Sequence, residues 1–327
     1  MDTQATDTTK DKERRGLANL NVGWGVVAAL AAEIILMSIL SPYFLKVQNL
    51  FNVFKSISFI GIVSVGMTMV IIVGGLDLSV GSMVGLGGMI TAGLITKGGF
   101  HPLLAVLIGL SSGAVIGYII SLFVNKLHIN AIIVTLAMLS ILKGFTYMIS
   151  KGSNIFLRVE GINYLGQGYI GPIPFPVILM IVIIALGALF LRFTVTGRQI
   201  YATGGNERAA KLAGIKVQRI RALVFILTST LAAFSGIVMT GMLGSAEISA
   251  GNGLELDVIA AVIIGGTSLK GGKGTVIGSL IGAAIMGILK NGFILLGFSF
   301  EMQIISIGLV IILAVVIDSL RTARASS

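Results

Sequence analysis

The sequence predicts an all-α membrane protein, a polytopic bundle of about ten transmembrane helices with an inverted internal repeat. Hydrophobic residues make up 55% of the chain, charged residues 11%, and the mean hydropathy is +1.02. That apolar surface exceeds what one compact core could bury. With no Cys and two His, disulfides, thiolate catalysis and metal centres are not expected.

Ten apolar windows of roughly bilayer length predict the helices. No small-residue cleavage site follows the first window, so we expect a retained helix rather than a signal peptide. The chain then divides into a tail at 1–21, a transmembrane domain at 22–320 and a tail at 321–327. The windows fall at residues 22–40, 56–73, 80–96, 103–124, 131–150, 175–193, 221–243, 256–269, 274–290 and 301–318.

The distribution of Lys and Arg supports this topology. The net charge of +10 would favour nucleic acid as a partner in a soluble protein, but here the cations lie in short segments between apolar spans. Ten crossings with both tails in the cytoplasm place sixteen Lys and Arg inside and six outside. We therefore expect membrane lipid, and no nucleic acid, around this chain.

The segment at 192–221 is a polar insert with seven Lys or Arg and a single acid, and it is predicted to be a cytoplasmic loop. Within it, Asn206 is a helix N-cap and Gly214 a terminator, and the residues between favour helix. Ala209, Ala210 and Ala213 would give this short helix a flat face flanked by cations. Such a helix can sit in a groove of a soluble partner, and the alternative is an interfacial helix on anionic headgroups.

An internal repeat relates two glycine-containing segments, 70–79 and 262–269. Each is followed by a Gly-rich apolar run, at 81–85 and 278–282. Five predicted helices separate the copies, and because five is odd the copies run in opposite directions through the membrane. A structural or gating role is assigned to residues at the two breaks, namely Gly74, Gly75, Asp77, Ser79, Gly265 and Gly266.

Few polar groups within the spans are candidates for function. Glu33 and Lys143 are ionisable at membrane depth, which suggests function, but either can face a protein groove or snorkel. Asp77 is expected mainly to cap the N–H groups of the helix that follows it. Gly109, Gly113 and Gly117 recur every four residues and indicate close helix packing.

The stretch at 270–275, Lys-Gly-Gly-Lys-Gly-Thr, superficially suggests a phosphate-binding loop. No Gly-x-x-x-x-Gly-Lys-[Ser/Thr] passes through it, and it follows an apolar span rather than a short strand. The sequence therefore offers no nucleotide site. The external segments at 151–176 and 244–257 are either solvated connections or a docking rim for an external partner.

Three blocks carry a resemblance to a known family. Residues 75–81, 197–210 and 255–268 with 271–274 together resemble the ribose-type monosaccharide permeases of bacterial ATP-binding-cassette (ABC) importers, over about 42–318. The resemblance implies a permease of the bacterial inner membrane that is not an enzyme and has no cofactor of its own. It implies three partners: a cytoplasmic ATPase, a periplasmic or lipoprotein sugar-binding protein, and a second permease copy or a sister subunit. The implied coupling residues are Gly204, Gly205, Asn206, Glu207, Arg208, Ala209, Ala210, Ala213 and Gly214.

The mechanism expected from this resemblance is alternating access driven by the ATPase. Candidate lining groups, chosen for polarity and spacing, are Asn130, Thr135, Ser140 and Thr146. The rival class is an ion-coupled secondary carrier, which also shows inverted repeats but places acids or histidines in mid-membrane. The residues are compatible with several sugars.

Overall fold

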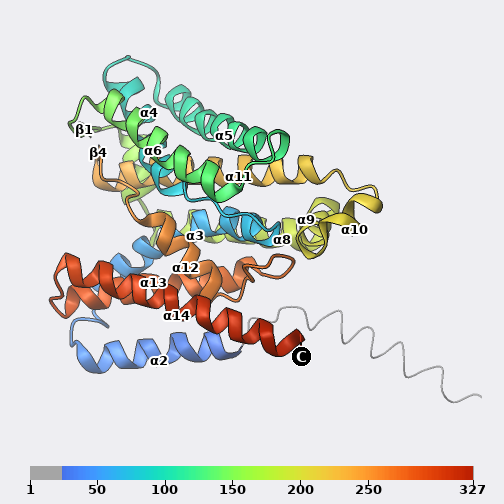
Figure 1. Cartoon of the computed structure of the whole chain (residues 1–327). Helices are drawn as coiled ribbons and strands as arrows, with labels where there is room; N and C mark the ends of the chain where they lie inside the picture. Colours follow the sequence, from blue (N-terminus) through green and yellow to red (C-terminus); the bar gives the residue numbers. More distant parts are fainter. Residues whose placement is uncertain (1–23, 327) are drawn as a thin grey trace, which may run out of the picture.

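The computed structural model describes residues 24–326, and the tail assigned to 1–21 lies outside them (Figure 1). Apart from two-residue strands, the regular structure is helical, so the chain is all-α as predicted. The helices are α2 (Trp24–Leu40), α3 (Val47–Ile72), α4 (Val80–Thr96), α5 (Pro102–Lys126), α6 (Ala131–Ser150), α7 (Glu160–Gln167), α8 (Phe175–Phe193), α9 (Val195–Gly205), α10 (Glu207–Leu212), α11 (Val217–Leu243), α12 (Leu254–Ile264), α13 (Val276–Leu295) and α14 (Phe300–Ser326). The strands are β1 (Ile155–Phe156), β2 (Tyr169–Ile170), β3 (Ile173–Pro174) and β4 (Ser245–Ala246).

Each of the ten apolar windows overlaps a helix. Among the described residues, however, six helices are long and apolar enough to cross a bilayer: α3, α5, α6, α8, α11 and α13. Helices α2 and α4 and the stretch 301–313 of α14 are apolar but shorter. The chain is thus a helical membrane protein, and the count of about ten crossings is not confirmed.

Helix α3 is the centre of the molecule. Every residue from Ile57 to Ile72 is buried, on all sides of the helix. Its hydroxyl side chains bond within the helix, since Ser64 donates to the Ile60 carbonyl at 2.7 Å and Thr68 to the Ser64 carbonyl at 2.6 Å. A helix that is apolar on all sides is typical of a protein core or of a membrane span, and here α8, α11, α12 and α13 pack on it.

Glycines bring the outer helices close to one another. The buried residues of α5 include Gly109, Gly113 and Gly117, the predicted small-residue stripe. A Cβ on Gly117 would come within 2.4 Å of the Phe225 carbonyl oxygen of α11, so the two backbones touch. The stripe is therefore a packing device, as the spacing predicts.

Several helix boundaries differ from the predicted windows. Helix α3 begins at Val47 rather than near 56, because Asn49 in its polar first turns exchanges amide hydrogen bonds with Asn291 of α13 at 2.9 and 2.8 Å. Helix α12 ends at Ile264 rather than near 269, because the glycine pair that follows turns the chain. At the far end of the chain, α14 continues through 321–326, which the sequence assigned to the tail.

The two external segments form one surface. Strand β1 pairs antiparallel with β4, placing Ile155 opposite Ala246 and Phe156 opposite Ser245. Helix α7 lies against α11, where the Gln167 side chain donates to the Met242 carbonyl at 3.0 Å. The segments predicted as loops at 151–176 and 244–257 are thus joined by hydrogen bonds.

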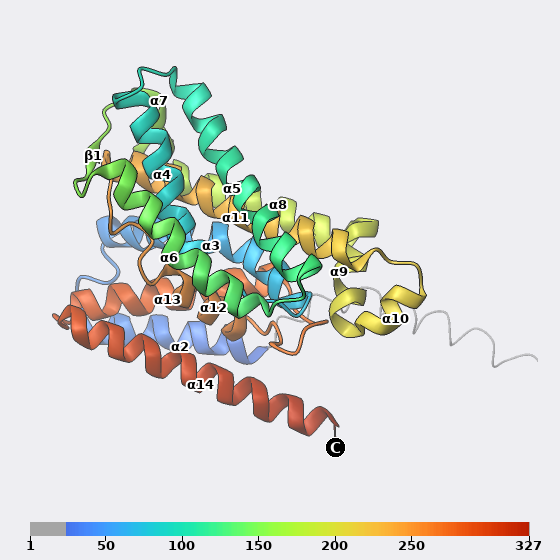
Figure 2. The same ribbon diagram turned by 45° about the horizontal axis from the view of Figure 1, so that its top comes forward.

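Helices α9 and α10 lie at one end of the bundle, as both views show (Figure 2). The start of α2 and the end of α14 lie toward this same end, whereas β1, α7 and the turn between α13 and α14 lie at the opposite end. The two ends of the molecule therefore carry different structures, and the long polar segment defines one of them.

Candidate functional site

The polar segment at 192–221 folds into helices rather than an open loop. Thr194 begins α9 by accepting a hydrogen bond from the Gly197 N–H at 2.9 Å, and Asn206 begins α10 by accepting from the Ala209 N–H at 2.9 Å. The backbone at Gly214 has φ of +81°, which ends the helical run. The predicted cap and terminator are confirmed, while α9 was not predicted and α10 is shorter than the 206–214 expected.

The exposed face of α10 differs from the predicted one. Ala210 is only 4% exposed, whereas Arg208, Ala209 and Ala213 are exposed and Leu212 is 86% exposed. The prediction that the three alanines share one flat face is therefore wrong, because Ala210 is turned toward the protein. The surface offered to a partner consists of Arg208, Ala209, Lys211, Leu212 and Ala213.

Glu207 anchors α10 to the bundle. Its carboxylate pairs with Lys211 one turn later at 2.7 Å and with Arg221 at the start of α11 at 2.5 Å. The hydrogen bond from Lys211, together with that from Arg221 and the charges of both, holds the pKa of Glu207 below its ordinary value. The only acid of the segment thus fixes the orientation of the short helix.

A backbone contact between three distant segments lies directly before α10. We define the glycine junction as the end of α3 at 72–74, the end of α9 at 204–205, and the loop at 271–274 (Figure 2). Within it the Gly272 N–H donates to the Ile72 carbonyl at 2.8 Å. A Cβ on Gly204 would lie 1.6 Å from that carbonyl oxygen and 2.7 Å from the Gly272 nitrogen, so only glycine fits there.

A side-chain hydrogen bond also holds the junction together. The Tyr201 hydroxyl of α9 donates to the Gly274 carbonyl at 2.8 Å. Gly271, Gly272 and Gly274 all have positive φ, of +83°, +74° and +157°. Gly205, by contrast, has open space where a Cβ would be. The glycines at 271–274 therefore allow this loop to make close contact with α9 and α3.

The two glycine breaks of the repeat have the same geometry. After α3 the backbone at Gly74 has φ of +81°, and after α12 the backbone at Gly266 has φ of +91°. In each break the next N–H reaches the carbonyl five residues earlier, closing the end of the helix. These bonds run from Gly75 to Val70 at 2.9 Å and from Thr267 to Val262 at 3.1 Å.

Close packing distinguishes the second break from the first. A Cβ on Gly265 would lie 2.4 Å from the Gly278 backbone of α13, whereas one on Gly75 would first meet the Val70 side chain at 3.2 Å. The break after α12 is therefore pressed against the following helix at Gly265, whereas Gly75 of the break after α3 has more room.

Asp77 and Ser79 shape the entry into α4. Asp77 is fully buried, and its Oδ1 accepts from the Ser79 N–H at 2.9 Å and the Ser79 hydroxyl at 2.6 Å. Asp77 therefore does not cap α4 directly as predicted. It bonds Ser79, the residue before the helix, and Ser79 occupies the N-cap position. The other oxygen, Oδ2, is buried without a hydrogen-bond partner among residues 24–326.

The four polar residues suggested as path-lining groups do not share one face of α6. Asn130 caps the helix through the Ile132 N–H at 2.9 Å, and Ser140 is exposed. Thr135 and Thr146 are buried, and each hydroxyl donates to a carbonyl of the preceding turn. The Thr135 hydroxyl also lies 3.3 Å from the Leu76 carbonyl, which precedes α4. The four residues are thus a helix cap, an exposed serine and two buried threonines whose hydroxyls bond backbone carbonyls.

The two ionisable residues within the spans lie in different environments. Glu33 of α2 has both carboxylate oxygens buried, and neither has a hydrogen-bond partner within the described part of the chain. Lys143 of α6 is half-buried. The glycine junction was not predicted from the sequence. The run of glycines at 271–274 is the feature of the sequence that could have indicated it.

The chain is similar to known membrane permeases along most of its length. A family model described as the permease component of the branched-chain amino acid transport system matches residues 49–315. The ribose import permease protein RbsC of Escherichia coli (strain K12) is 42% identical over 295 residues, covering 89% of this chain and 92% of that protein. RbsC of Bacillus subtilis (strain 168) is 41% identical over 303 residues, or 91% and 93% of the two chains.

A third relative is named for a different sugar. The D-allose transport system permease protein AlsC of E. coli (strain K12) is 37% identical over 304 residues, which is 91% of each chain. No solved structure matches the chain. The stretch matched by the family model contains α10, the glycine junction and both glycine breaks.

Proposed function

Because this chain belongs to the family of permease components of the branched-chain amino acid transport system, we propose that it forms the membrane passage of an ATP-driven monosaccharide importer. The observation that carries the proposal is its similarity, over about nine-tenths of its length, to proteins named as ribose and D-allose permeases. We assign it a ribose-like sugar as substrate and the bacterial inner membrane as its location.

The ATP is hydrolysed by a separate cytoplasmic ATPase subunit. The sequence contains no Gly-x-x-x-x-Gly-Lys-[Ser/Thr] through 270–275. The glycines of that loop are engaged with α9 and α3 instead, since Gly272 bonds Ile72 and lies against Gly204. The chain is accordingly a permease and not an enzyme, and it needs no cofactor of its own.

Helix α10 is the element on which the ATPase docks. Leu212 is 86% exposed, one residue after Lys211 and one helical turn after Arg208, so an apolar side chain is exposed on a basic helix. An interfacial helix needs a large apolar face to bind headgroups, and the six residues of α10 provide little. A partner groove that accepts Leu212 and pairs with the cations fits this surface better.

The glycine junction is the route by which docking reaches the membrane. Helix α9 runs directly into α10, and its last residues touch the end of α3 and the loop before α13. In a contact between backbones no side chain can change its rotamer to absorb a displacement. A movement of α10 is therefore transmitted to both glycine breaks. The permease then rocks between outward- and inward-facing states, which is alternating access.

The topology of the importer follows from the same elements. We propose ten crossings related by an inverted repeat, with both tails in the cytoplasm, in keeping with the excess of Lys and Arg assigned to that side. The start of α2 and the end of α14 lie toward the α10 end of the bundle (Figure 1). The surface formed by β1, β4 and α7 faces outward, where a sugar-binding protein delivers the ligand. A second permease, either another copy or a sister subunit, completes the passage.

Reconstitution tests the proposal directly. Proteoliposomes with the permease, its ATPase and its binding protein should accumulate labelled ribose only when ATP is supplied to the ATPase. Omitting either partner should abolish accumulation, because the permease has no source of energy. Uphill transport of the sugar by the permease alone, driven by a sodium or proton gradient, would make it an ion-coupled carrier and overturn the proposal.

A further inference from the structure

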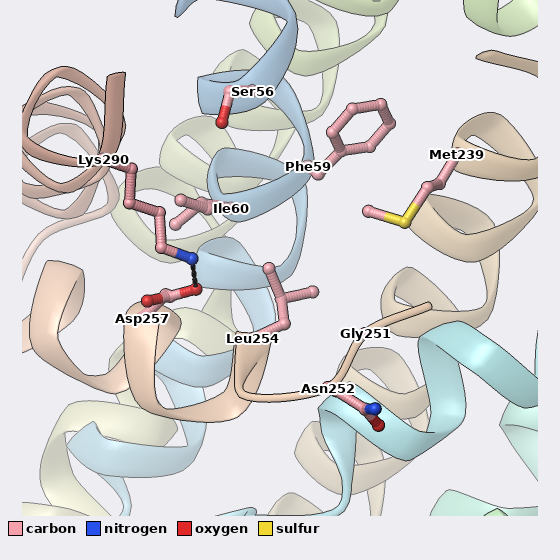
Figure 3. Close-up of a pocket in the computed structure, with 9 residues that line it drawn as sticks. All are labelled: Ser56, Phe59, Ile60, Met239, Gly251, Asn252, Leu254, Asp257 and Lys290. Carbon is pink, nitrogen blue, oxygen red and sulfur yellow. Dashed lines mark hydrogen bonds and ion pairs between the residues drawn. The ribbon is translucent and has the colours of Figure 1, made fainter. Parts of the chain in front are cut away.

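A polar cavity lies in the half of the bundle opposite α10. It has a volume of about 180 Å³ and is bordered by the first half of α3, the start of α12 and the last turns of α11 and α13 (Figure 3). The lining residues relevant to ligand chemistry are Ser56, Phe59, Asn252, Asp257 and Lys290. Since one water molecule needs roughly 10–15 Å³ of such space, the cavity is many times larger than a single-water site and can admit a small polar ligand.

The ion pair in this cavity lies far from the other ion pairs of the described residues. Lys290 of α13 pairs with Asp257 of α12, and Figure 3 shows the pair at the wall of the cavity. The other two ion pairs within residues 24–326 both involve Glu207, at the opposite end. Asp257 is 2% exposed, whereas the Lys290 side chain remains 32% exposed. Burying charges in a membrane protein is costly, so such pairs often mark functional sites.

We propose that this cavity is a binding site for the transported sugar within the permease, an inference that rests on the proposed function. Each sugar hydroxyl both donates and accepts hydrogen bonds. The Asp257 carboxylate accepts from one hydroxyl, and the Lys290 ammonium donates to a neighbouring one. Bonds to charged groups of this kind are the stronger class of hydrogen bond.

Other lining groups complete the recognition of a sugar. The ring of Phe59 provides an apolar surface for the C–H face of the sugar, and Figure 3 shows it with Met239 on one side of the cavity. Asn252 and Ser56 add neutral polar groups at the border. Because no third charged residue lines the cavity among the described residues, the pair leaves the site neutral. The site therefore selects an uncharged aldose over a sugar phosphate.

The inference is tested by equilibrium dialysis of labelled ribose against the purified permease without its partners. Wild-type permease should bind ribose saturably, and allose and arabinose should compete for the site. Ribose 5-phosphate should compete poorly. Asp257→Asn and Lys290→Gln should each weaken binding at least about tenfold, through loss of one charge-assisted hydrogen bond. Lys55→Gln is the matched control, because Lys55 lies on α3 beside the lining residue Ser56 but bonds the Tyr169 hydroxyl at 3.0 Å, and neither Lys55 nor Tyr169 lines the cavity.

A charge exchange separates binding from folding. The double variant Asp257→Lys with Lys290→Asp restores an ion pair with its partners reversed, so Tm should recover relative to the single variants while ribose binding stays weak. Wild-type affinity in the single variants, or recovery of binding together with Tm, would make the pair purely structural and overturn the inference. ATP-driven uptake by the full importer is measured in parallel. Normal uptake by wild type with no ribose binding to the permease refutes this site alone, whereas absent uptake refutes the proposed function.

Discussion

The glycine junction makes a sharp prediction for the substitution Gly204→Ala. The new Cβ would lie 1.6 Å from the Ile72 carbonyl oxygen and 2.7 Å from the Gly272 nitrogen, where ordinary contacts need 3.4–4 Å. Overpacking of this kind costs about 1–3 kcal/mol, and the lost Gly272 to Ile72 hydrogen bond about 1 kcal/mol more. The higher helix propensity of Ala offsets about 1 kcal/mol of this destabilisation. The net effect is about 2 kcal/mol against the assembled junction, or roughly 30-fold in its population.

The assay follows transport and ATP hydrolysis together in proteoliposomes that contain the complete importer. Because the exposed face of α10 is unchanged, Gly204→Ala should still bind the ATPase, but ribose taken up per ATP hydrolysed should fall at least about tenfold. Gly205→Ala is the matched control, since it is the next residue of α9 and no atom lies within 4 Å of its added Cβ. Equal coupling and equal Tm in the two variants would refute the reasoning.

Three further predictions concern α10 and the packing of the bundle. Leu212→Asp should abolish copurification of the ATPase, while Phe156→Asp, 78% exposed at the opposite end, should preserve it; the reverse result would remove α10 as the docking element. Glu207→Gln should speed hydrogen exchange in α10 by at most about fivefold at pH 7. Because the pKa of this carboxylate is lowered, its stabilisation is present above the ordinary value of 4.5, and the difference should vanish as the pH falls through the lowered pKa. Gly117→Val should lower Tm by several degrees, since its Cβ meets the α11 backbone at 2.4 Å, whereas Gly144→Ala, with open space around it, should not; equal Tm values would contradict the packing argument.

Local features of the sequence predicted much of the fold. The apolar windows found the helices because a hydrophobic run of bilayer length rarely forms anything other than a helix. The N-cap at Asn206 and the terminator at Gly214 were also predictable, since both act on their immediate neighbours. The start of α3 was missed because its first turns are polar, and an amide pair with Asn291 replaces the apolar signal.

Contacts between distant segments could not be predicted in the same way. Gly204 and Gly272 are far apart in the chain, and glycine carries no side chain whose chemistry would identify its partner. The exposed face of α10 was mispredicted for a related reason. Spacing places Ala209 and Ala210 on a short helix, but the ion pair of Glu207 with Arg221 decides which of them faces the protein. Asp257 and Lys290 likewise meet only after α12 and α13 have packed.

The hydroxyls of α3 bear on how this protein is made. Ser58, Ser64 and Thr68 each donate to a carbonyl of the preceding turn, so the helix meets their hydrogen-bonding needs before any neighbour arrives. Helix α3 can therefore enter the lipid early during synthesis and wait there as an independent span. Its later neighbours then displace lipid from every side of it, and the contact of Thr68 with the Ser279 hydroxyl at 2.7 Å forms only when α13 has been inserted. The innermost helix is thus inserted into the membrane before its neighbours bury it.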